Sequence, residues 1–208
     1  MTINHEAFWS ARYRDAGDDY LFGTAPNRFL AEQADRLGAG MQVLSVADGE
    51  GRNAVWLAEQ GCAVTATEIS APALAKARKL AAGRHVTVDF VLTDILRWDW
   101  PVAQFDAVVG IFIQFVGGLE RALLFAAMQA AVKPGGLILL QGYTPQQLVY
   151  KTGGPSAVDN LYTEEMLRST FAGWQIEHLK AHEASIEEGL AHVGHSALID
   201  LVARRPLG

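Results

Sequence analysis

Residues 42–58, QVLSVADGEGRNAVWLA, contain the strongest structural signal in the chain. The apolar run Gln42–Ala47 predicts a short buried strand, and Asp48-Gly49-Glu50-Gly51 predicts a tight turn. The following residues, RNAVWLAEQ, predict a helix with its small and apolar side chains on one face, which Gly61 ends. A strand that runs through a glycine-rich turn into a helix is the first half of a βαβ unit.

The same alternation continues on the C-terminal side of this stretch. CAVTATEI predicts a strand, and Ser70 is expected to cap a helix, APALAKARKLAA, with Pro72 in its first turn. VTVDFVLT and FDAVVGIFI follow as strands, then a helix over Glu120–Val132, the turn KPGG and the strand LILLQGY. Strands that alternate with helices predict a parallel sheet with right-handed crossovers.

Three other parts complete a single expected domain over residues 1–208. Residues 1–40 are predicted to form an N-terminal lid segment of two helices, the second being RFLAEQADRL with Asn27 as its cap. Residues 41–143 form the core, and residues 144–208 contain a substrate-side loop, Thr144–Tyr162, followed by two strand-like segments. A short loop separates Trp174–Ile186 from His195–Arg205, so they are expected to pair antiparallel.

The composition narrows the class of protein. The chain has 208 residues, half of them hydrophobic, with 17 basic and 23 acidic side chains and a net charge of −6. This acidic balance gives no general attraction to nucleic acid or to anionic membranes. The single cysteine, Cys62, excludes an internal disulfide, and no apolar run suggests a signal peptide or a membrane span. We therefore expect a cytoplasmic α/β protein with a small-molecule partner; the oligomeric state stays open.

The turn at Gly49 and Gly51 has the chemistry of a nucleotide-binding loop. Glycines permit close approach of a ligand to the backbone, and the free amides of the next helix favour an anionic group. Glu68, at the end of the second strand, is suited to accept hydrogen bonds from ribose hydroxyls. The letters GEGRNA also satisfy the dinucleotide pattern of dehydrogenases, so a NAD-type oxidoreductase is an alternative. The bulky Arg52 and Asn53 at the helix start, and the terminal strand pair, weigh against it.

The chain resembles the class I S-adenosylmethionine-dependent methyltransferases. VLSVADGEGRNAVWLA, TATEIS, VLTDILRW, FDAVVGIF and VKPGGLILL are similar to five successive motifs of that family. The resemblance implies a Rossmann-like three-layer sandwich, with a seven-stranded, mostly parallel sheet whose last strand is antiparallel. It also implies that Glu68 binds the ribose and that Asp94 and Ile95 contact the adenine. The full set of expected cofactor contacts is Tyr20, Gly23, Ala47, Asp48, Gly49, Gly51, Asn53, Glu68, Ile69, Asp94, Ile95 and Ile111.

The outer parts of the chain resemble a bacterial subgroup described as tellurite-resistance-like. FWSARYRD, YLFGTAPNRFL, GYTPQQLVYKTGGP and EEGLAHVGHSALIDLVARR carry this similarity. Two departures from the family loop stand out: Ser45 replaces the usual acid, and Ala47 replaces the first glycine. We expect Ala47 to cost little if its φ is negative, and Asp48 or an N-terminal residue to replace the missing acid.

The predicted function is methyl transfer from S-adenosylmethionine to a small molecule, such as a thiol or a chalcogen oxyanion. His192 and Tyr150 are the candidate catalytic residues: the His192 imidazole can act as a base or orient an anion, and Tyr150 lies in the loop after the fifth strand. Substrate-side candidates also include Phe112, Tyr143, Lys151 and His195, and Phe22 is expected in the lid. The spacing of Cys, His, Asp and Glu suggests no metal site. A catalytically silent S-adenosylmethionine-binding protein is a further alternative.

Overall fold

The computed structural model describes residues 4–207, and its strands form one seven-stranded sheet in the order β3-β2-β1-β4-β5-β7-β6. The strands are β1 (Gln42–Ser45), β2 (Ala63–Glu68), β3 (Asp89–Leu92), β4 (Phe105–Ile111), β5 (Val132–Tyr143), β6 (Gln175–Glu188) and β7 (His192–Arg204). β1 and β3 pair parallel with β2, and β4 pairs parallel with β5. β7 is antiparallel to β5. The expected Rossmann-like sheet, mostly parallel with an antiparallel last strand, is confirmed.

Within this fold the chain divides into two compact units. The first contains the residues up to Asp99 together with Glu188–Ala191, which is the last residue of β6 and the short turn that leads to β7. The second contains Trp100–Glu187 and the residues from His192 onward.

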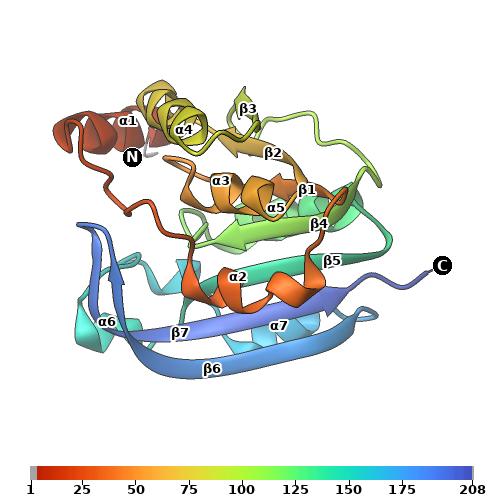
Figure 1. Cartoon of the computed structure of the whole chain (residues 1–208). Helices are drawn as coiled ribbons and strands as arrows, with labels where there is room; N and C mark the ends of the chain where they lie inside the picture. Colours follow the sequence, from red (N-terminus) through yellow and green to blue (C-terminus); the bar gives the residue numbers. More distant parts are fainter. Residues whose placement is uncertain (1–3, 208) are drawn as a thin grey trace. The chain divides into compact units, whose positions relative to one another are not determined.

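The first unit holds four helices among its described residues: α1 (His5–Asp15), α2 (Arg28–Glu32), α3 (Arg52–Glu59) and α4 (Ala71–Gly83). α1 packs on α4, and α3 packs on β2 (Figure 1). The predicted caps are present: Asn27 accepts a hydrogen bond from the Leu30 amide, and Ser70 accepts one from the Ala73 amide. Gly61 takes the left-handed φ of 86° that ends α3. The glycine-rich turn lies between β1 and α3.

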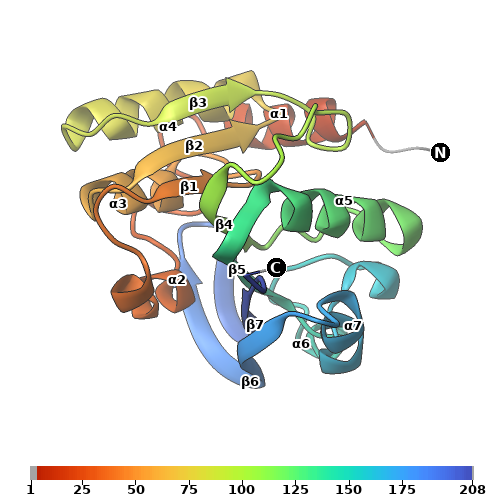
Figure 2. The same cartoon turned by 90° about the vertical axis from the view of Figure 1, so that its right-hand side faces the viewer.

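The second unit holds α5 (Gly118–Ala131), α6 (Gln147–Tyr150) and α7 (Glu164–Thr170) among its described residues. α5 packs along β4 and β5 (Figure 2). β4 has completely buried residues at Ala107, Val108 and Val109, as expected of a strand covered on both faces. Phe125 contacts Tyr162 and Phe171 to form an aromatic core.

Several predicted boundaries need correction. The helix expected over RFLAEQADRL ends at Glu32, because Gln33 leaves helical geometry and only a 3₁₀ turn, Ala34–Arg36, follows. The loop Thr144–Tyr162 contains the short α6 and a 3₁₀ turn. α7 was not predicted, although its signal was present: the Thr163 hydroxyl caps the helix, and Glu164 and Glu165 occupy its first turn. No helix within residues 4–207 is long and apolar enough to cross a membrane.

Candidate functional site

The glycine-rich turn is shaped by Asp48. Its carboxylate accepts a hydrogen bond of 2.5 Å from the Ser45 hydroxyl and one of 3.3 Å from the Ala54 amide. Gly51, which precedes the first residue of α3, has no side chain to cap the helix, so Asp48 satisfies one of the helix's free amides. Burial raises the pKa of Asp48 to about 6. Ser45 therefore occupies the position at which the related loops carry an acid, and its hydroxyl donates a hydrogen bond to Asp48.

Ala47 departs from the expectation that its φ would be negative. Its φ is 49°, in the left-handed region, and its amide donates to the Thr67 hydroxyl at 3.2 Å. An alanine in this conformation brings its Cβ close to the following carbonyl oxygen. Backbone strain is thus present at the position where related loops have glycine.

Glu68 lies at the end of β2 and is only 4% exposed. Its carboxylate accepts hydrogen bonds from the Gly49 amide at 3.0 Å and from the Ser70 amide at 2.9 Å. Burial outweighs these bonds and raises the pKa of Glu68 to about 7. The predicted ribose acid is therefore held against the glycine-rich turn, with oxygens that can accept further hydrogen bonds.

The turn itself forms a cradle that tolerates no side chain at its two glycines. Gly49 and Gly51 have φ of 66° and 92°. A Cβ on Gly51 would lie 2.9 Å from the Ala77 Cα, and a Cβ on Gly49 would lie 2.7 Å from the Tyr13 hydroxyl oxygen. Backbone amides, a carboxylate acceptor and a phenol thus lie close together at the turn. This donor and acceptor set fits a ligand with a ribose and a charged amino-acid end, as S-adenosylmethionine has.

Tyr13 lies beside Gly49 in the candidate site, and the sequence reasoning missed it. It is 4% exposed, and its pKa is raised well above 10, first by burial and then by the carboxylates of Glu68, Glu50 and Asp48. Its ring lies 6.0 Å from that of Trp9 and 6.3 Å from that of Phe22, measured between centroids. The signal was the spacing of Trp9 and Tyr13, four residues apart and thus on one face of α1.

The 20–27 segment, Tyr20–Asn27, is tied to the glycine-rich turn by several hydrogen bonds. The Phe22 amide donates to Glu50 at 3.4 Å, and the Asn27 amide donates to the Asn53 side chain at 2.9 Å. Tyr20 packs beside α3 and α4, and its hydroxyl donates to the Lys76 carbonyl at 3.1 Å. Tyr20 thus anchors the segment, and its contact with a cofactor stays a prediction.

The predicted adenine contacts lie in the loop after β3. The Asp94 carboxylate accepts from the Leu96 amide at 3.0 Å and lies 3.7 Å from the Arg97 side chain, while remaining partly exposed. Ile95 is buried and Ile69 is half-buried. Ile111 belongs to the second unit, where it ends β4 and pairs with Gln141.

In the second unit, His192 joins an aromatic cluster that also contains Phe112 and Tyr143. The Phe112 ring stacks on Tyr143 with centroids 4.7 Å apart and meets His192 edge-on at 4.6 Å. Phe112 follows β4 directly and has a φ of 56°. Such a conformation is uncommon for a bulky residue and tends to occur at functional sites. Leu148, Leu161, Leu198, Ala184 and Ile186 pack around the same cluster.

Tyr150 lies in a separate, exposed group with Glu183 and His195. Its hydroxyl donates to Glu183 at 2.6 Å, and His195 lies 3.1 Å from the other Glu183 oxygen. The hydrogen bond to Glu183 raises the pKa of Tyr150, and the same bond lowers the pKa of Glu183. The neighbouring Lys151 is exposed, with a φ of 56°. The two predicted catalytic residues, His192 and Tyr150, thus have different surroundings.

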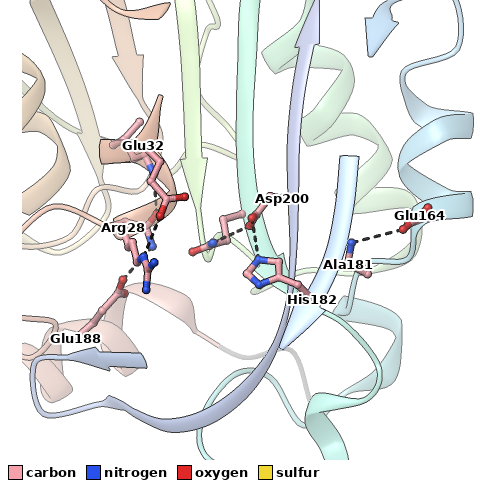
Figure 3. Close-up of polar contacts among 10 residues, drawn as sticks. Arg28, Glu32, Glu164, Ala181, His182, Glu188 and Asp200 are labelled. Atoms are coloured by element: carbon pink, nitrogen blue, oxygen red, sulfur yellow. Dashed lines mark hydrogen bonds and ion pairs between the residues drawn. The ribbon is translucent and has the colours of Figure 1, made fainter. Parts of the chain in front are cut away.

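A polar row that the sequence reasoning did not single out runs across the neighbouring strands β5, β7 and β6. The His182 ring lies 2.8 Å from Asp200, and Gln141 donates to the other Asp200 oxygen at 2.7 Å (Figure 3). Gln141 and Asp200 are direct partners on β5 and β7, and both are buried. Within residues 4–207 no group of three or more His, Cys, Asp or Glu side chains is placed to hold a metal ion.

Comparisons with known proteins agree with this geometry. The family described as "Methyltransferase domain" matches residues 43–136, which run from β1 into β5. Malonyl-[acyl-carrier protein] O-methyltransferase of Salmonella typhimurium is 28% identical over 200 residues, covering 91% of this chain and 77% of its own length.

Two solved structures show the same fold at lower identity. One, described as the conversion of a disulfide bond into a thioacetal group during echinomycin biosynthesis, has a TM-score of 0.79 at 21% identity and covers 98% of this chain and 93% of its own. TehB from Haemophilus influenzae has a TM-score of 0.72 at 16% identity, covering 96% of this chain and 66% of its own. Residues 43–136 thus match the methyltransferase domain family, and the sheet has the fold of these similar solved structures.

Proposed function

We propose that the chain transfers the methyl group of S-adenosylmethionine to a small molecule, with a thiol as the preferred acceptor. The observation that carries this proposal is the make-up of the cluster around Phe112, Tyr143 and His192. Leu161 and Leu198 pack with Tyr143, and Phe112, Leu148, Ala184 and Ile186 pack against them, so these residues give it apolar packing. A soft, weakly hydrated nucleophile suits such surroundings better than a strongly hydrated oxyanion, whose desolvation needs a paired cation.

The position of this cluster supports a substrate-side role. Phe112 follows the end of β4, and Tyr143 is the last residue of β5. Ligands of open α/β sheets bind beyond the carboxyl ends of the strands. The cofactor, when bound, supplies an electrophilic methyl group on a positively charged sulfur. The chain's own residues then have to orient the acceptor, exclude water and, for a neutral acceptor, remove one proton.

We assign the proton removal to His192 and a positioning role to Tyr150. An imidazole and a thiol have ordinary pKa values roughly two units apart, so the proton transfer is close to balanced. The Tyr150 hydroxyl already donates to Glu183, and this bond keeps the phenol protonated. Tyr150 therefore holds α6 to β6, while His192 stands beside the aromatic rings.

The proposed cofactor contacts keep the residues inferred from the motifs and add one. The glycine-rich turn supplies Gly49 and Gly51, with Glu68 beside them. The loop after β3 supplies Asp94 and Ile95, and α1 supplies Tyr13. A tellurite-resistance-like activity has weaker support, since it rests only on the resemblance of the outer segments of the chain to that subgroup. A chalcogen oxyanion is therefore the second acceptor class to test.

The experiment is an acceptor screen with the purified chain and S-adenosylmethionine. Small thiols, tellurite and selenite, and small carboxylates are supplied in turn, and S-adenosylhomocysteine and the methylated product are measured by mass spectrometry. We expect turnover with thiols, lost in His192→Ala and retained in His178→Ala. His178 is a matched control on β6.

Each other outcome redirects the assignment. Turnover on oxyanions alone would replace the thiol with the second acceptor class. Turnover on carboxylates would point to the chemistry named for the Salmonella relative. Binding of S-adenosylmethionine without turnover on any acceptor, including an acylated carrier protein, would contradict the proposed enzymatic function and favour a silent binding protein.

A further inference from the structure

We propose that Glu188 is a positioning residue for the cofactor, because it latches the tip of the β6–β7 hairpin onto the 20–27 segment. The hairpin tip is Glu188–Ala191. It belongs to the first unit, whereas the residues on both sides of it belong to the second. This inference rests on S-adenosylmethionine binding and is independent of which acceptor is methylated.

The first observation is a buried ion pair. A Glu188 oxygen lies 2.7 Å from the Arg52 guanidinium, and the two side chains are 12% and 7% exposed. The other Glu188 oxygen accepts from the Asn27 side-chain amide at 3.0 Å. Arg52 also donates to the Phe22 carbonyl at 3.2 Å. Separating such a pair leaves an uncompensated buried charge, so the position in which Glu188 contacts Arg52 is strongly preferred.

The second observation is independent of charge and concerns the backbone. The amides of Leu190 and Ala191 both donate to the Leu21 carbonyl, at 2.8 and 3.1 Å. Gly189 and Gly23 meet backbone to backbone: a Cβ on Gly189 would lie 2.3 Å from the Gly23 nitrogen. Both glycines have left-handed φ, 67° and 74°. Only glycines allow this close approach of two backbones. The backbone at both positions therefore favours the contact between the tip and the 20–27 segment.

These contacts lead directly to the cofactor loop. Arg52 is the first residue of α3 and follows Gly51 of the glycine-rich turn. The segment held by the tip also bonds to Glu50 and Asn53 of the same region. Glu50, in turn, pairs with Lys76 at 2.9 Å. Glu188 therefore acts on the turn through Arg52 and the 20–27 segment, without touching the reacting atoms.

The test uses two variants. Glu188→Gln keeps the shape of the side chain and removes its charge. Gly189→Ala keeps the Glu188 charge and prevents the close contact between the tip and Gly23. We expect each to raise the Kd of S-adenosylhomocysteine about tenfold by calorimetry, as when the competent state falls to about one tenth of the population. In the unliganded variants, hydrogen exchange at Leu190 and Ala191 should accelerate. In turnover assays the KM for S-adenosylmethionine should rise with little change in kcat.

Matched controls separate the latch from general damage. Glu187→Gln removes a neighbouring exposed carboxylate, and Gly17→Ala imposes a side chain at a φ of 58° with no atom within 4 Å. Both should leave the Kd unchanged. Arg52→Gln should abolish most of the further effect of Glu188→Gln, because the two act through one pair.

Two different results would contradict the role of Glu188 and the cofactor assignment. Faster exchange at Leu190 and Ala191 with an unchanged Kd in both Glu188→Gln and Gly189→Ala would show that the tip opens without consequence for the cofactor. No binding of S-adenosylhomocysteine to the wild-type chain would instead remove the cofactor assignment itself, which distinguishes the two failures.

Discussion

At the scale of single residues, Glu68 is where cofactor affinity should be most sensitive. The sequence placed it by motif, and the structure holds its carboxylate against the Gly49 amide at the end of β2. Glu68→Ala removes the acceptor for the ribose hydroxyls, and we expect S-adenosylhomocysteine binding to weaken by about 1–3 kcal/mol. Calorimetry measures the loss, with Glu32→Ala as a control in an exposed pair with Arg28. An unchanged Kd in Glu68→Ala would remove Glu68 from the ribose site.

At Ala47 we expect a substitution that stabilises the folded chain. Its φ of 49° suits glycine, and related loops carry glycine there. Ala47→Gly relieves the strained contact but adds backbone freedom to the unfolded chain, so the net gain should be about 1 kcal/mol or less. Urea unfolding followed by fluorescence gives the free energy of unfolding. A loss of stability would mean that the Ala47 methyl group contributes packing that outweighs the strain.

At the scale of elements, the start of α3 depends on Gly51. Its φ is 92°, and a Cβ there would meet the Cα and Cβ of Ala77 at 2.9 and 2.8 Å, so α3 and α4 approach each other closely at this point. Gly51→Ala should destabilise the fold by about 2–4 kcal/mol, from overpacking and the unfavourable φ together. Gly173→Ala, at a φ of 86° with open space around it, isolates the φ contribution. Equal losses of unfolding free energy in the two variants would show that the helices separate freely.

Prediction from the sequence succeeded for elements whose signals are local. The capped helix after Ser70, the glycine that ends α3 and the apolar β4 each follow from neighbouring residues. The helix expected over residues 28–37 begins at Arg28 as predicted, but its predicted end was wrong, because Gln33 leaves helical geometry. Motif positions likewise identified Glu68 and the glycines.

The remainder of the site is assembled by contacts between residues far apart in sequence. Tyr13 reaches the turn from α1, Glu188 reaches Arg52 from 136 positions away, and Asp200 joins Gln141 across two strands. Each of these is a common polar or aromatic residue whose neighbours are set by tertiary packing. A single sequence holds no signal for such pairs.

At the scale of the whole molecule, the buried carboxylates link stability to pH. The pKa of Glu68 rises from 4.5 to about 7 on folding, so the folded chain binds its proton more tightly than the unfolded chain does. This contribution is fully present below about pH 4.5, is lost as the pH rises to 7, and is constant above that value. Asp48, with a pKa of about 6, changes stability in the same direction.

Comparison with Glu68→Gln isolates this effect, because the amide resembles the protonated acid at every pH. The unfolding free energy of the variant minus that of the wild type should increase between pH 4.5 and 7, by about 3 kcal/mol at most. Cofactor binding should have the opposite pH dependence: hydroxyl donors favour the ionised carboxylate, so S-adenosylhomocysteine should bind the wild type more tightly as pH rises toward 7. Calorimetric titrations from pH 5.5 to 8.5 should show this trend in the wild type and little of it in Glu68→Gln. A flat wild-type profile would mean that Glu68 keeps one protonation state throughout, and the linkage between cofactor and stability would fall with it.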